Sequence, residues 1–291
     1  MKQNIFKEAC LIQLGTSCWQ GSRSIDPSIM EQIGNSEWVR GRKYLVDQEV
    51  LAPVRSSINR ARKELDQMAL PFPIGGLTLV PKDCLTRIEE KLKEYRKEYF
   101  QEVERFIEGY EKAREIAQSI LGDLYSESDY PMHIRNKFGF EWRYFVLETP
   151  GKHKLLSPEV YERERRKFTT MMEETKELAV RALREEFADY VDHIVDRLKD
   201  GENGKAKIVK ESKIQRFMTF LDSFDSRNLF HDDELANLVE SAKELLNGVP
   251  PGALRQDQDL RESIKKKMGE VKEEMDKALV DLPRRKIRLA A

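Results

Sequence analysis

The sequence predicts a mainly α protein with a long antiparallel, coiled-coil-like helical hairpin, a small β element and a C-terminal helical bundle. Two long segments, 85–121 and 157–199, place apolar residues at steps of three and four, which is the spacing of one helix face. Charged residues make up 35% of the 291 residues and apolar residues 40%, with a mean hydropathy of −0.65. This composition is typical of solvated helices that each carry one apolar stripe.

The N-terminal segment, 1–84, is predicted to hold a strand, a helix and a second extended element. "ACLIQLGTSCWQGS" is rich in strand-favouring residues, which indicates a strand near 9–19. A helix is expected over about 45–69, where Pro53 favours a kink or a late start. The prolines and Gly-Gly turn of "LPFPIGGLTLVP" indicate extended structure over 70–81.

The middle segment, 85–199, carries the predicted hairpin. Its first helix has a heptad seam with one four-residue stutter near Tyr99 and would be roughly 55 Å long at 1.5 Å per residue. Its second helix begins with Ser157 as N-cap and Pro158 in the first turn. Two helices of similar length joined by a short β-like insertion, 134–150, should pack antiparallel.

The C-terminal segment, 208–291, is predicted to contain three helices and a basic tail. One of these helices follows "HDDE", which places His231, Asp232, Asp233 and Glu234 together. Consecutive residues point in different directions around a helix, so these four cannot all bind one metal ion. Carboxylates in a first helical turn accept from free N–H groups and oppose the helix dipole, so the cluster indicates a helix start.

A second acidic cluster could bind a metal ion. Asp189, His193 and Asp196 share one face of the predicted helix over 157–199, and a partner helix would have to complete the site. The sequence contains no HExxH motif and no second His or Cys cluster that would supply the remaining ligands. A solvated acidic face is the commoner cause of such a pattern, so no metal is predicted.

The β-like insertion contains a row of aromatic residues that has two interpretations. On a strand, Phe138, Phe140, Trp142 and Tyr144 share one face. Cations close by are Lys137 and Arg143, and the tail adds Arg284 and Arg285. Rings beside cations suit a single-stranded nucleic-acid platform, because bases stack on rings and cations bind phosphates. The favoured alternative is that the rings are the buried face of a small sheet and that the tail is a solvated terminus.

Several classes of protein are disfavoured. The sequence contains no phosphate-binding loop, dinucleotide-binding fingerprint, nucleophile elbow or zinc-type Cys/His spacing, so neither catalytic residues nor a cofactor is predicted. Lys plus Arg (51) nearly balances Asp plus Glu (52), which gives no global attraction to nucleic acid or membrane. Three cysteines without CxxC pairing, no secretory signal and no apolar run of about 20 residues lead us to expect a cytoplasmic protein.

Segments along nearly the whole chain resemble a bacterial and phage family of unknown function, number thirty-one fifty. The resemblance rests on "GRKYLVD", "LPFPIGGLTLVP", "FIEGYEKA", "FLDSFDSRNLFHDDELANLVESAKELLNG", "ALRQDQDLRESI" and "LPRRKI". It implies a mostly helical protein of phages and mobile elements, often encoded near MoxR-like AAA ATPases and von Willebrand A-type proteins. It implies no catalytic residues.

Three functions therefore stand as expectations. The first is a non-enzymatic adaptor or scaffold that binds a protein partner, which could be an AAA ATPase. The second is a single-stranded nucleic-acid-binding protein that uses residues 138–144. The third, and weakest, is a metal-dependent enzyme built on the acidic helix.

Overall fold

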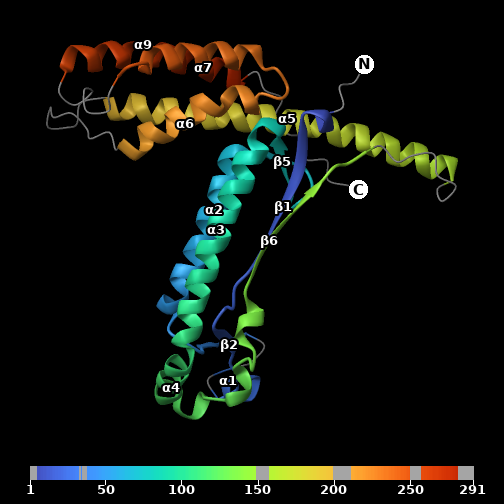
Figure 1. Cartoon of the computed structure of the whole chain (residues 1–291), viewed down its shortest axis with the longest axis vertical. Helices are drawn as coiled ribbons and strands as arrows, with labels where there is room; N and C mark the ends of the chain where they lie inside the picture. Colours follow the sequence, from blue (N-terminus) through green and yellow to red (C-terminus); the bar gives the residue numbers. More distant parts are fainter. Residues whose placement is uncertain are drawn as a thin grey trace. The chain divides into compact units, whose positions relative to one another are not determined.

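A computed structural model describes residues 5–32, 34, 38–148, 157–198, 211–249 and 257–280. The chain forms two compact units (Figure 1). Unit 1 comprises residues 1–11, 67–84 and 145–291, and unit 2 comprises residues 12–66 and 85–144. The predicted class, mainly α with a small β element, is confirmed. The sequence predicted three consecutive segments, whereas each unit combines segments that are distant in the sequence.

Unit 1 is a helical assembly with a short β ladder. Its elements are η1 (Ile5–Lys7), the first residues of β1 (Ala9–Ser17), β4 (Leu70–Pro71), β5 (Thr78–Pro81), α5 (Pro158–Leu198), α6 (Glu211–Arg227), α7 (Asp233–Leu246) and α9 (Gln258–Val280). Strands β4 and β5 pair antiparallel, with Leu70 opposite Leu79. The helix boundaries follow the apolar stripes that the sequence shows, because each stripe needs a partner to leave water.

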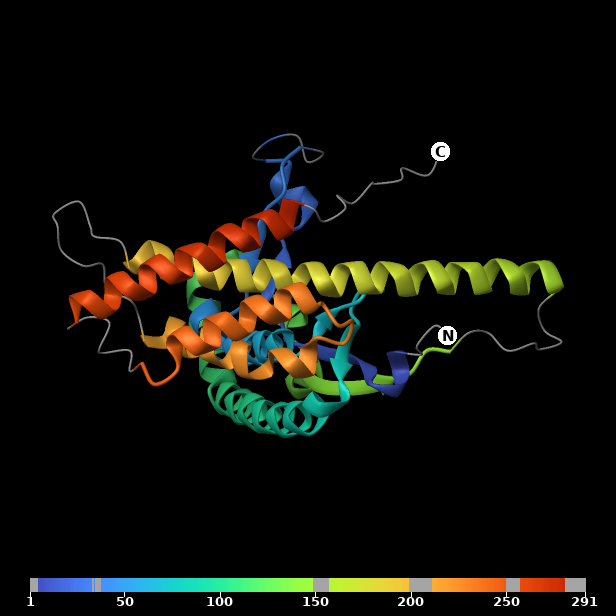
Figure 2. The ribbon, with the colours of Figure 1, turned by 90° about the horizontal axis from the view of Figure 1, so that it is seen from above.

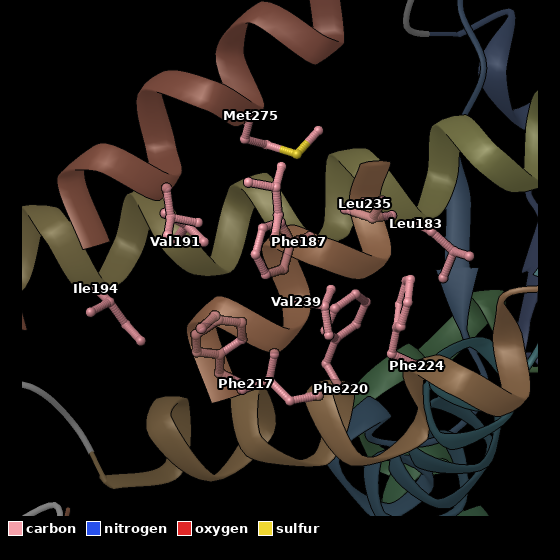
Figure 3. Close-up of a cluster of buried hydrophobic side chains, with 14 of the residues drawn as sticks. Leu183, Phe187, Val191, Ile194, Phe217, Phe220, Phe224, Leu235, Val239 and Met275 are labelled. Carbon is pink, nitrogen blue, oxygen red and sulfur yellow. The ribbon is translucent and has the colours of Figure 1, made fainter. Parts of the chain in front are cut away.

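The core of unit 1 lies between α5, α6, α7 and α9. Phe187 of α5 is fully buried, and its ring centroid lies 6.0 Å from that of Phe217 and 6.1 Å from that of Phe220, both on α6. Figure 3 shows Phe187 surrounded by side chains from α6, α7 and α9. A core of this kind is the main source of the unit's stability.

The partner of α5 differs from the predicted one. Helix α9 runs alongside α5 (Figure 2). The Lys272 ammonium lies 2.6 Å from Asp192, and Arg184 donates to the carbonyl oxygen of Ala278, so the two helices are antiparallel. The predicted partner, the helix over 85–121, belongs to unit 2. The hairpin prediction is corrected in this respect. An apolar stripe shows that a helix packs against a partner but does not say which one, and α9 carries an apolar stripe just as the helix over 85–121 does.

Unit 2 combines helices with the remaining strands. Its elements are most of β1, β2 (Ser22–Ser24), α1 (Pro27–Met30), β3 (Arg42–Tyr44), η2 (Gln48–Leu51), most of α2 (Ala52–Met68), most of α3 (Lys82–Glu108), α4 (Tyr110–Leu121), η3 (Gly122–Leu124), η4 (Glu127–Asp129), η5 (Ile134–Lys137) and most of β6 (Gly139–Phe145). Pro53 lies in the first turn of α2, where a missing N–H costs nothing, so the late start is confirmed.

The predicted helix over 85–121 is two helices, because α3 ends at Glu108 and α4 begins at Tyr110. Its heptad seam is buried in the middle, where Tyr99 and Val103 are fully buried, and becomes exposed at Ile120. Within unit 2, the Arg60 guanidinium on α2 lies 2.7 Å from Glu98 on α3, which places these two helices side by side.

Strands β4, β5, β1 and β6 follow one another in that order in a four-stranded sheet. Within unit 2, Gly15 of β1 lies beside Glu141 of β6 and Ser17 lies beside Gly139, so these strands run antiparallel. The pair β2 and β3 forms a separate hairpin-like ladder with Ser22 opposite Tyr44. The strands expected near 9–19, 70–81 and 134–150 are all present.

Candidate interaction surfaces

One end of unit 2 is built from short elements that are fixed by buried polar contacts. The Lys43 ammonium on β3 lies 2.6 Å from the Asp129 carboxylate and donates to the carbonyl oxygen of Leu124 at 2.6 Å. The buried Tyr130 hydroxyl donates to the carbonyl oxygen of Leu45 at 2.9 Å. We call this region, formed by β2, β3, α4, η3 and η4, the tip of unit 2; α1, β2 and α4 gather there in Figure 1.

Arg114 of α4 makes a second set of contacts within the tip. Its guanidinium lies over the rings of Tyr110 and Tyr130, at 5.8 and 5.2 Å from their centroids, and pairs with Glu111 and Glu127. Burial raises the pKa of Tyr110 and of Tyr130 to about 12, so both hydroxyls stay neutral. Arg114 therefore joins α4 to η4.

Large apolar side chains nevertheless point into water on the elements of the tip and beside them. Trp38, just before β3, is 87% exposed, Met132, just after η4, is 91% exposed, and Ile120 of α4 is 78% exposed. Exposed apolar side chains of this size are candidate contact residues for another molecule where they form a contiguous patch.

The aromatic row of β6 is divided into two halves. Phe138 and Phe140 are buried, and their rings lie 5.5 Å from those of Phe106 and Tyr99. These two rings cannot stack on bases, because other side chains of unit 2 cover them. For them the buried-face interpretation holds and the assignment as nucleic-acid-binding residues is corrected.

The outer half of the row, Trp142 and Tyr144, is hydrogen-bonded to one carboxylate. Glu89 accepts hydrogen bonds from the Trp142 indole N–H and the Tyr144 hydroxyl, both at 2.8 Å. Burial alone would raise the pKa of Glu89, but these two hydrogen bonds and Lys93 outweigh it and lower that pKa. Tyr144 remains 42% exposed, and Lys137 is exposed as well. Arg143 lies in solvent and pairs with Glu141 at 2.9 Å.

The "HDDE" cluster is a helix start, as predicted. Asp232 is the N-cap of α7 and accepts from the backbone N–H of Leu235 at 3.2 Å. His231 precedes it with a φ of 53°, in the left-handed region. The sequence did not indicate the second role of this cluster, because the partner residue lies 48 positions away.

That partner is Arg184, which joins α5 to α7 and α9. Its guanidinium donates to both carboxylate oxygens of Asp232, at 2.7 and 2.8 Å, to Glu234 at 2.7 Å, and to the carbonyl oxygen of Ala278 at 2.8 Å. Burial alone would raise the pKa of Asp232, but the hydrogen bonds from Arg184 and Leu235 hold it below its usual range. The geometry is that of a structural ion pair.

Arg227 makes a similar connection four residues before His231. It is buried, and its guanidinium donates to Glu186 of α5 at 2.7 Å and lies over the ring of Phe220. Asn228 accepts from the backbone N–H of Asp232 at 2.8 Å. The segment "RNLFHDDE" therefore fixes α6, α7 and α5 to one another.

The acidic face of α5 does not form a ligand cluster with other elements that the structure describes. Asp189 and Asp196 are exposed, and their neighbour Asp192 pairs with Lys272 of α9. Burial, together with Lys213 and Arg197, lowers the pKa of His193. Within residues 5–280, apart from the segments outside the structure, no group of three or more His, Cys, Asp or Glu is arranged to hold a metal ion. Arg284 and Arg285 lie outside the described residues.

The protein is mainly α, and its helices and strands carry both apolar and charged side chains that are exposed to solvent. The chain belongs to the family described as "Protein of unknown function (DUF3150)", which matches residues 6–266. No curated protein and no solved structure matches it. None of the described helices is long and apolar enough to cross a bilayer.

Proposed function

We propose that this protein is a non-enzymatic adaptor or scaffold that binds a protein partner in the cytoplasm. The observation that carries the proposal is the tip of unit 2, where Trp38, Met132 and Ile120 are exposed beside or on elements fixed by Lys43 and Arg114. Polar contacts that hold the neighbouring elements in place lower the entropy cost of docking, because those elements are already ordered. The three cysteines, which form no CxxC pair, agree with a reducing compartment.

The proposed partner is an AAA ATPase of a phage or mobile element. The resemblance of the sequence segments to this family supports the proposal, because it implies genes that lie near MoxR-like AAA ATPases. An adaptor needs no chemistry of its own. An adaptor presents one ordered surface to the ATPase and a second surface to the substrate. A chain with two compact units could use one unit for each.

The proposal predicts that changing the tip weakens binding without unfolding the protein. We expect a Trp38→Ala, Met132→Ser double variant to bind a purified MoxR-like AAA ATPase from the same genome about 30-fold more weakly, because aromatic anchors contribute about 2 kcal/mol or more at interfaces. Binding is measured by surface plasmon resonance and folding by a thermal melt.

Ile74→Ser is the matched control, because Ile74 is an exposed apolar residue in the turn between β4 and β5 of unit 1. Its affinity should equal that of the wild type. Equal affinity of the tip variant and the wild type, or no binding by the wild type at all, would reject the tip as the docking surface for such an ATPase.

A second candidate function is binding of single-stranded nucleic acid at the outer end of β6. The observation that favours it is the exposure of Tyr144 next to the solvated cation Arg143, with a second exposed cation, Lys137, before the other end of the strand. Glu89 and Glu141 oppose it, because their carboxylates lie beside the same rings and would repel phosphates. This is why the adaptor comes first.

This candidate predicts that Tyr144→Ala weakens binding to an oligothymidine by about 1–3 kcal/mol while the melting temperature stays close to that of the wild type. Fluorescence anisotropy at two salt concentrations gives the affinity and its salt dependence. Phe140→Ala is the contrasting variant, since a buried ring should affect stability and change binding only through unfolding. Unchanged binding by a folded Tyr144→Ala would remove this candidate.

A further inference from the structure

Strand β6 is the end strand of the four-stranded sheet, next to β1 on one side. In the part of the chain that the structure describes, no strand pairs with its other side. Open edges of this kind offer a row of N–H and C=O groups to another strand, and soluble proteins usually protect them with proline, lysine or a bulge. The seven residues "GFEWRYF" of β6 contain neither proline nor lysine.

The side chains of β6 are complementary to those of an identical strand that runs in the opposite direction. If Trp142 lies opposite Trp142 of a second copy, Glu141 of each strand lies opposite Arg143 of the other, and Phe140 lies opposite Tyr144. Glu141 and Arg143 are 65% and 63% exposed, so both charged groups are available on the solvent side. We propose that two copies of this chain pair antiparallel through the β6 edges, with Trp142 at the twofold axis.

Charge selects this register over its neighbours. A strand can slip only by two residues if the same face is to stay buried. A slip of the pairing by one such step in one direction places Glu141 opposite Glu141, and in the other direction Arg143 opposite Arg143. Like charges directly opposite each other destabilise a strand pair, whereas opposite charges and aromatic pairs each contribute up to about 1 kcal/mol.

In the proposed register the four charged groups alternate. Glu141 already lies 2.9 Å from Arg143 on its own strand. The second copy places a further guanidinium across from each carboxylate, at the distance of cross-strand neighbours. The rings of Trp142 and Tyr144, which are held by Glu89, would meet the rings of the second copy on the other face and leave water. A closed twofold pair covers the β6 edge of both copies.

The proposal concerns β6 and is independent of the function proposed for the tip. Its test is the mass of the full chain by sedimentation equilibrium over a range of protein concentrations. We expect the wild type to change from 34.1 kDa toward twice that value as concentration rises. Arg143→Glu should raise the dissociation constant about tenfold or more, because it places two like-charge pairs in the interface.

The double variant Glu141→Arg, Arg143→Glu exchanges the charges and should restore dimerisation to nearly the wild-type constant. Arg105→Glu, a charge reversal at an exposed position of α3, is the control and should leave the constant unchanged. Because an altered strand could misfold, amide hydrogen exchange of the wild type supplies a second readout. Within residues 139–145, every second amide, those that point to the open edge, should exchange more slowly at high concentration than at low concentration.

Any one of several results would overturn the proposal. They are a monomeric wild type at every concentration, a dimer that Arg143→Glu leaves intact, and a dimer that the charge exchange does not restore. Loss of the dimer after nuclease treatment would also overturn it, since nucleic acid would then be bridging the copies.

Discussion

Replacing Val103 by Asp is expected to lower the free energy of unfolding by about 4 kcal/mol or more, because an unpaired carboxylate would enter the core of unit 2. Val103 is fully buried on the face of α3 that also carries Tyr99 and Phe106. Chemical denaturation followed by far-UV circular dichroism measures the effect.

Gln101→Asp is the matched control, because Gln101 lies on the exposed side of the same helix. The control should change stability by less than about 0.5 kcal/mol. A Val103→Asp protein as stable as this control would show that the stripe of α3 faces solvent.

Removing the guanidinium of Arg184 is the second change with a large expected effect. Arg184→Ala should cost about 3–5 kcal/mol, because the carboxylate of Asp232 would remain buried without its partner. The Asp232 side chain is only 6% exposed, so water cannot replace the two lost hydrogen bonds. Thermal and chemical denaturation of the variant give the loss.

The pH dependence separates this mechanism from a simple packing defect. In the wild type the pKa of Asp232 is lowered, so its contribution is present above the unfolded pKa of about 3.9 and is lost as pH falls through the folded value. In Arg184→Ala the lowering by the guanidinium is lost, while burial, which raises that pKa, and the hydrogen bond from the Leu235 N–H remain. The stability difference between the two proteins should therefore shrink as pH falls.

Arg165→Ala provides the comparison, since Arg165 forms an exposed pair with Glu162 on the same helix. Such a pair contributes less than about 1 kcal/mol. A loss for Arg184→Ala no larger than for Arg165→Ala, or a difference from the wild type that does not depend on pH, would contradict the role assigned to Arg184.

Local patterns in the sequence predicted the helices and strands whose formation depends on neighbouring residues. The stripe over 157–199 predicted α5, the carboxylates after His231 predicted the start of α7, and the period of two in 138–144 predicted β6. Each of these features depends on residues within a few positions, so the chain can be interpreted without its three-dimensional context.

Features that depend on distant residues could not be predicted in this way. The apolar stripe of α5 is covered by α9, which follows only after α6 and α7. Nothing in the stripe itself specifies that partner. Asp232 was understood as an N-cap, but its ion pair with Arg184 joins residues 48 positions apart. The aromatic row was treated as one surface, whereas Tyr99 and Phe106 cover its inner half only.

The way in which the two units share the chain bears on the order of folding during synthesis. All of unit 2 precedes residue 145, so its core can form while the ribosome is still adding α5. The segments 1–11 and 67–84 are made just as early but belong to unit 1, whose helices follow only after residue 157. Until then Leu70, Phe72 and Leu79 lack the side chains that bury them in the finished protein. A nascent chain at this stage exposes apolar β4 and β5 residues, which is the kind of intermediate that chaperones bind.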